Sequence, residues 1–209
     1  MEIEFIQKNI VILGVFKPGM FDKLFFIKNN LLNEDAFLEN CIFTTEFSFI
    51  DSKEFTINIT QEQIVINDKN PNININIQNF ASAIIQNQEV KIIAVGYNLK
   101  WFMFVQDELN KITKDMFYSP NNLIINKFFN TDDSVFGYYA SKNYKYSRLK
   151  LDVKPLFVKR VDNSETRKVL NFDFNFHIDN NFKNSELAEL VLDYENFIVE
   201  AKEIIKEYV

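Results

Sequence analysis

Alternating apolar and polar residues predict several β-strands along the chain. The clearest is Val169–Ile178, where Phe172, Phe174 and Phe176 alternate with polar residues. Because successive strand side chains point to opposite faces, this period of two predicts one apolar and one polar face. Comparable patterns predict strands at 42–50, 55–59, 63–66, 136–139 and 144–158, and one or two strands within 3–16. The nearly continuous apolar run 91–97 predicts a central strand covered on both faces.

Apolar residues at helical spacing predict helices at 21–32, 78–88 and 108–117, and a long one at the C-terminal end. The last follows Ser185 as N-cap and carries Glu186 and Glu189 in its first turn, where the helix dipole favours acidic groups. We therefore predict an α+β fold in one domain spanning residues 1–209. In it, a mostly antiparallel twisted sheet packs against an N-terminal helix, Phe21–Leu32, and a long C-terminal helix, Ser185–Tyr208.

This order of elements resembles a sporadically distributed, uncharacterised bacterial protein family. The matching segments are Phe55–Ile66, Val95–Asn98, Leu170–Phe174 and the helix over Glu186–Val209. The chain departs from the family in lacking an Arg before the aromatic residue of the Val95–Asn98 segment, and in being shorter. The resemblance supports the fold prediction and implies no reaction, because it brings no catalytic residues with it.

The composition and the start of the chain indicate where the protein is expected to occur. High Asn, Ile, Lys and Phe usage is typical of AT-rich coding, as in some low-GC bacteria or their phages. The single cysteine, Cys41, excludes an internal disulfide framework. The start of the chain is acidic, unlike a secretory signal, and the apolar run Ile10–Phe16 is too short to span a bilayer. We therefore expect a cytoplasmic protein with no membrane association.

The absence of familiar catalytic motifs shapes the functional expectation. The chain has no Gly-rich phosphate loop, no dinucleotide-binding fingerprint, no Gly-x-Ser-x-Gly and no His-Glu-x-x-His. We therefore expect a non-catalytic interaction or accessory protein without a cofactor. Its partner would be another protein or further copies of itself.

One enzymatic alternative starts from Asp68, Glu89 and Lys91. An Asp followed later by Glu-x-Lys is similar to the magnesium-binding residues of restriction-type nucleases. In such a site the carboxylates hold the metal, and the lysine stabilises charge that develops on the scissile phosphate. The proline that usually precedes the Asp is missing here.

The polar face of the Val169–Ile178 strand suggests a second alternative, a metal site formed by Asp173, His177 and Asp179. Residues two apart on a strand lie about 6.5 Å from each other, so neighbouring pairs can reach one cation but all cannot. The competing interpretation is a solvated outer sheet face.

A basic segment suggests a nucleic-acid-binding alternative. Seven cations and one acidic residue lie between Tyr138 and Arg160, in a chain of net charge −6. Alternation predicts that Tyr144, Tyr146, Arg148 and Lys150 share one strand face. Aromatic rings beside cations can stack and neutralise single-stranded nucleic acid. They can equally cover an ordinary sheet, because their apolar parts shield it while their tips stay in water.

Overall fold

One antiparallel sheet of nine strands organises the molecule. The computed structural model describes residues 2–72, 76–86, 92–159, 166–179 and 181–208. The strands lie in the order β2-β3-β4-β5-β1-β6-β9-β8-β7. Their bounds are β1 Glu2–Gly14, β2 Ile42–Phe43, β3 Ser48–Asp51, β4 Phe55–Ile59, β5 Gln63–Asp68, β6 Ile92–Phe104, β7 Tyr138–Tyr144, β8 Ser147–Lys159 and β9 Thr166–Asp179.

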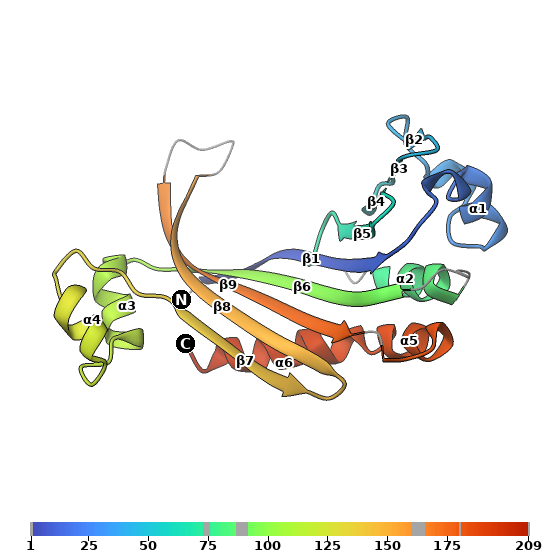
Figure 1. The fold of residues 1–209 in the computed structure, drawn as a ribbon. Coiled ribbons are helices and arrows are strands. Elements are labelled where there is room, and N and C mark those ends of the chain that lie inside the picture. The colour runs from blue at the N-terminus through green and yellow to red at the C-terminus, as the bar shows by residue number, and fades with distance from the viewer. Residues whose placement is uncertain (1, 73–75, 87–91, 160–165, 180, 209) are drawn as a thin grey trace.

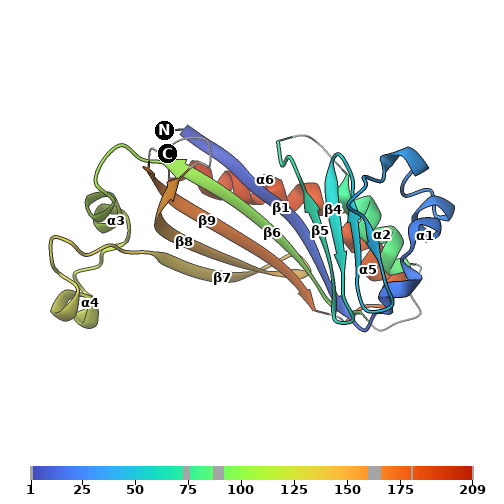
Figure 2. The ribbon, with the colours of Figure 1, turned by 90° about the horizontal axis from the view of Figure 1, so that it is seen from above.

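The helices divide into a group that covers the sheet and a group that lies at its ends. The described α-helices are α1 Lys23–Lys28, α2 Ile77–Gln86, α3 Leu109–Phe117, α4 Leu123–Phe128, α5 Asn184–Val191 and α6 Tyr194–Lys206. Helices α2, α5 and α6 lie along one face of the sheet, whereas α3 and α4 project beyond one end of it (Figures 1 and 2). The predicted α+β class with a large antiparallel sheet is confirmed.

The core fills the space between the sheet and these three helices. Helix α2 packs against α5 and against β1 and β5, while α6 packs against β6 and β9. Fully buried rings from β9 and the helices, among them Phe172, Phe176, Tyr194 and Phe197, meet there. The inner positions of each strand alternate with outer ones, so buried apolar side chains of β1, β6, β8 and β9 enter this one layer.

The predicted C-terminal helix is wrong in one respect, because it is two helices. Helix α5 begins after Lys183, whose backbone N–H donates to the Glu186 carboxylate at 3.0 Å, so Ser185 is not the cap. The helix is interrupted at Leu192 and Asp193, and Asp193 directly precedes α6. Its carboxylate accepts hydrogen bonds from Lys145, Tyr146 and Asn196, which fix this short-chain polar residue at a helix start.

The predicted N-terminal helix is also shorter than expected, and it does not lie across the face of the sheet with α6. Helix α1 lies beside the β2–β4 end of the sheet (Figure 2) and buries only Phe26. The Asp22 side chain caps its start by accepting from the Phe25 N–H at 2.8 Å. Its end lies at Asn29 and Asn30, and the latter has a φ of 54°, a left-handed conformation that asparagine tolerates.

The strands also refine the predictions. Of the one or two strands predicted within 3–16, the structure has one, β1, with an irregularity between Phe5 and Gln7. The 42–66 region is antiparallel throughout, but the single strand predicted over 42–50 is two short strands, β2 and β3, which pair with each other. Strand β6 is central as predicted, since it pairs with β1 and β9, but it is not covered along its whole length, because Ile93 is 53% exposed. Among the described residues, no helix combines the length and apolarity needed to cross a membrane.

The position of Phe197 leads to a stability prediction. Its ring is fully buried, with ring centroids 4.9 Å from Tyr97 and 4.6 Å from Phe176. We expect Phe197→Ala to lower the free energy of unfolding by about 3–5 kcal/mol, since it leaves a cavity where three elements meet. Val199→Ala, at a 55% exposed position of the same helix, is the matched control and should change it by less than about 0.5 kcal/mol. Chemical denaturation measures both, and equal effects would show that α6 does not pack as described.

Candidate functional site

The sheet face opposite α6 carries a broad set of polar side chains. It is flanked at one end by β2–β5 and at the other by the upturned ends of β8 and β9 (Figure 1). We call it the polar sheet face. Its outward residues are Gln7 and Asn9 of β1, Asn67 of β5, Asn98 and Lys100 of β6, Arg148, Lys150 and Asp152 of β8, and Asp173, Asn175 and His177 of β9. A hollow of about 320 Å³ lies among the residues from β1, β6, β8 and β9.

Four asparagines form a continuous amide ladder across the polar sheet face. The strand register places Asn67, Asn9, Asn98 and Asn175 side by side on β5, β1, β6 and β9. The Nδ2 of Asn175 donates to Oδ1 of Asn98 at 2.7 Å, and that of Asn98 donates to Oδ1 of Asn9 at 2.8 Å. Asn9 in turn donates to Asn67 at 3.3 Å. Since an amide can donate and accept at once, each inner member satisfies two neighbours.

Most charges beside the ladder are already paired. Lys100 lies 3.3 Å from the Asp173 carboxylate, and Lys154 lies 2.5 Å from that of Asp152. Hydrogen bonding to Asp152 raises the pKa of Lys154 and keeps it charged. The face therefore offers alternating charge and not a continuous basic track.

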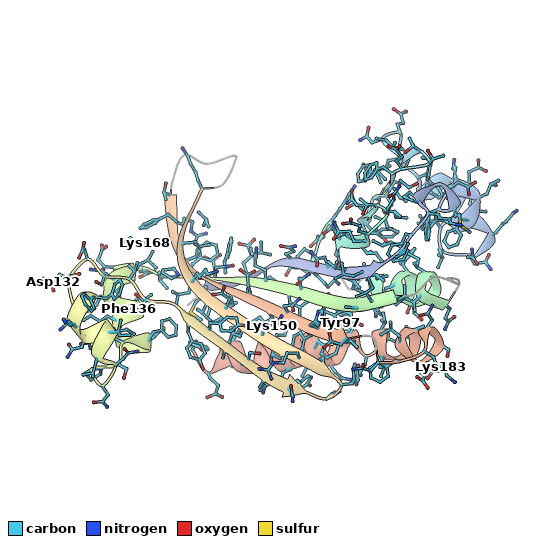
Figure 3. The ribbon with its side chains drawn as sticks, viewed as in Figure 1. Tyr97, Asp132, Phe136, Lys150, Lys168 and Lys183 are labelled. Carbon is cyan, nitrogen blue, oxygen red and sulfur yellow. The ribbon has the colours of Figure 1, made fainter. Side chains whose placement is uncertain are left out.

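Arg148 and Lys150 lie on this face, as alternation predicts. Both are exposed, and Lys150 lies in β8 (Figure 3). Arg148 donates to the Asn143 side chain at 3.0 Å and to the Ser141 carbonyl at 3.3 Å. Neither cation forms a salt bridge with a carboxylate within the described part of the chain. Their role in binding stays a prediction.

Tyr144 and Tyr146 do not share that face, so this part of the strand prediction is wrong. Tyr144 ends β7 opposite the inward-facing Ser147, and Lys145, with a φ of 50°, then turns the chain toward β8, so both rings lie on the helix side. Tyr144 packs edge-on against Phe176. The Tyr146 hydroxyl donates to the Leu190 carbonyl and reaches the Asp193 carboxylate, both at 3.0 Å. Burial and the nearby Asp193 raise the pKa of Tyr146.

Asp68 lies in the core and not in a cleft. Its carboxylate forms an ion pair with Lys8 at 2.7 Å, and both side chains are almost fully buried on the helix side. Glu89 and Lys91 lie outside the described residues, so the nuclease alternative stays a prediction. The ion pair could have been anticipated from Lys8, because a lysine on the same strand face as Ile10 and Ile12 would be buried and would need an acidic partner.

The three metal-ligand candidates are not brought together. His177 contacts Asp179 at 2.9 Å, while Asp173 faces Lys100 and accepts from Asn171. In the described ranges, no three His, Cys, Asp or Glu side chains are grouped in a way that could hold a metal ion.

A second exposed surface lies on α4. Leu123, Ile124, Phe128 and Phe129 are 81%, 66%, 64% and 55% exposed, and no residue of α4 is buried. We call these four side chains the α4 apolar surface. Sequence reasoning missed it, because apolar residues at helical spacing are more often part of a core.

Comparisons with known proteins add no assignment. No protein-family model and no curated protein matches this chain. The resemblance in the order of elements therefore stays a prediction.

The buried Lys8–Asp68 pair gives a test of this geometry. We expect Asp68→Ala to lower the free energy of unfolding by about 3–5 kcal/mol, because it leaves the Lys8 charge buried without its carboxylate. The double variant Lys8→Met, Asp68→Ala should recover a large part of that loss, since no buried charge remains. Urea unfolding of the single and double variants measures the coupling. Additive losses would show that the two side chains do not interact.

Proposed function

We propose that the chain is a non-catalytic interaction protein that binds another protein through the α4 apolar surface. The observation that supports this is the exposure of four large apolar side chains on and beside one short helix. Single exposed apolar residues are ordinary on protein surfaces, but several large ones within a short stretch of chain favour an interaction site.

Polar contacts hold α4 in place although it buries nothing. The Asn122 side chain accepts from the N–H groups of Ile124 and Ile125, both at 3.2 Å. The Tyr118 hydroxyl donates to Asn126 at 2.9 Å, and Asn110 on α3 donates to the Asp132 carbonyl at 2.5 Å beyond the helix. A helix fixed before binding loses less conformational entropy on association, which favours affinity.

The base of this projecting part contacts the sheet, because Phe117 of α3 stacks on Tyr138 of β7 with ring centroids 5.9 Å apart. Phe136 is buried and packs against Tyr118, and its backbone N–H donates to the Thr113 hydroxyl at 3.1 Å. Helix α4 thus extends beyond the sheet on a packed base (Figures 1 and 3). Exposed apolar side chains on a short helix suit an apolar groove on the surface of another protein.

Substitutions on α4 test the proposal. We expect Phe128→Ser to weaken binding to the protein partner by at least about 30-fold, equivalent to about 2 kcal/mol, as central apolar contacts do. Leu123→Ser should act similarly, and both should leave stability nearly unchanged because the sites are exposed. The measurement is quantitative affinity capture from the native host, followed by titration of the captured protein.

The control is Val199→Ser, which removes another exposed apolar side chain, this one from α6. A partner that binds all three variants like the parent chain would contradict the proposal. Sedimentation of the purified chain tests whether the partner is a second copy of the same chain. Self-association of the parent that is lost in Phe128→Ser would show that it is.

Binding to nucleic acid is the second candidate, supported by the exposed cations Arg148 and Lys150 on the polar sheet face. If they contact phosphates, affinity should fall as salt rises, because counterions are released on binding. We expect the double variant Arg148→Glu, Lys150→Glu to weaken binding to single-stranded DNA or RNA and to flatten this salt dependence. Fluorescence anisotropy measures both.

Lys154→Glu is the matched control for charge alone, since Lys154 is on β8 but is paired with Asp152. Equal binding by the parent chain and the double variant, or no binding by either at physiological salt, would exclude this candidate.

A further inference from the structure

A pocket of about 480 Å³ lies between the start of β1 and α6. It exists because α6 packs over β6 and β9, which leaves the inner side of the first half of β1 without a helix above it. Residues 71 and 72 close one side. The residues that line it are Ile3, Phe5, Lys8, Pro71, Asn72, Trp101, Glu195, Ile198, Lys202, Ile205 and Lys206. Its size is within the range of sites for small molecules.

One wall of the pocket is aromatic and rigidly packed. Phe5 stacks on Trp101 with ring centroids 4.1 Å apart and planes within 5° of parallel. Trp101 in turn meets the edge of Phe174 at a centroid distance of 5.6 Å. Ile198 and Ile205 form the opposite, apolar wall on α6. A planar or extended apolar group would therefore find contacts on two sides.

The polar groups that line the pocket are mainly cationic, although the chain as a whole is acidic. Lys202 and Lys206 lie one helical turn apart on α6, with Glu195 further along the same side. Lys206 also contacts Glu203 at 2.5 Å. Lys202 forms no salt bridge with any carboxylate of the described chain. It is thus a cation beside an apolar pocket with its charge available to a ligand.

Lys8 adds a buried polar group to the same pocket. Its side chain is 2% exposed and its charge is balanced by Asp68. Removing two charges from water costs several kcal/mol per ion, so a buried pair is poor evidence of a purely stabilising role. Its place in the lining gives the pocket a polar end opposite the apolar walls, as in sites that orient a ligand.

We propose that this pocket binds a small organic anion with an apolar body. The body packs between Phe5 and Ile198, and the carboxylate meets the ammonium group of Lys202. Glu195 disfavours a dianion, because a second negative charge would lie near its carboxylate. The proposal does not depend on the α4 apolar surface, which lies on a different part of the molecule (Figure 2).

Trp101 makes the test direct, because it is the one tryptophan in the chain. Its emission can be excited selectively in the presence of phenyl compounds, which absorb at shorter wavelengths. The probes are 3-phenylpropionate, its neutral amide, the corresponding amine, and octanoate. We expect 3-phenylpropionate to change the Trp101 emission saturably and to bind at least tenfold more tightly than the amide. The amine should bind least, and octanoate reports whether an aliphatic body is accepted in place of the ring.

Variants separate the charge from the cavity. Lys202→Glu should weaken 3-phenylpropionate binding at least tenfold and reverse the preference between acid and amine. Ile198→Phe should fill the pocket and weaken all four probes. Lys154→Glu, on the opposite face of the sheet, should bind like the parent chain.

The proposal is overturned if acid and amide bind equally, or if folded parent chain binds no probe up to the solubility limit. It is also overturned if Lys202→Glu, shown to be folded by its unfolding transition, binds the acid as the parent chain does. Calorimetric titration of the same variants provides a readout independent of Trp101.

Discussion

Contact between α6 and the sheet centres on the Phe197 ring. It meets Tyr97 from β6, Phe176 from β9, Tyr144 from the end of β7 and Tyr146 from the turn that follows. Because this contact occupies one face of the sheet, the position of α6 determines what remains open. The polar sheet face stays free on the other side, and the pocket beside β1 exists because α6 is centred on β6 and β9.

Much of the fold could be predicted where the pattern is long and regular. The alternation in β9 and the apolar stripe from Leu187 to Ile205 both identify the buried face correctly, since burial imposes their period. The break at Asp193 could not be predicted from that stripe, because the period continues through it. What fixes the break is a set of hydrogen bonds from Lys145 and Tyr146, and their proximity to Asp193 is a tertiary fact.

The candidate sites were harder to predict. Arg148 and Lys150 follow from alternation with Leu149 and Leu151, which face the core. Tyr146 does not, because one left-handed residue in a tight turn reverses which side a ring occupies. The pairing of Lys8 with Asp68 joins two distant strands, so the sequence shows only that a charge on an apolar face needs a partner. The α4 apolar surface could not be predicted, because the sequence does not show whether another element covers a helix.

The amide ladder has a direction. Each of its three hydrogen bonds is donated from the β9 side toward β5, so the dipoles of the four side chains add instead of cancelling. Such chains polarise one another, and reversing one amide would place donor against donor unless its neighbours turned as well. The row therefore ends in a carbonyl oxygen at Asn175, on the strand next to Lys150, and in an amino group at Asn67. A molecule laid across this face would meet hydrogen-bond acceptance at one end and donation at the other, so the sheet could distinguish the two orientations of an otherwise symmetrical chain.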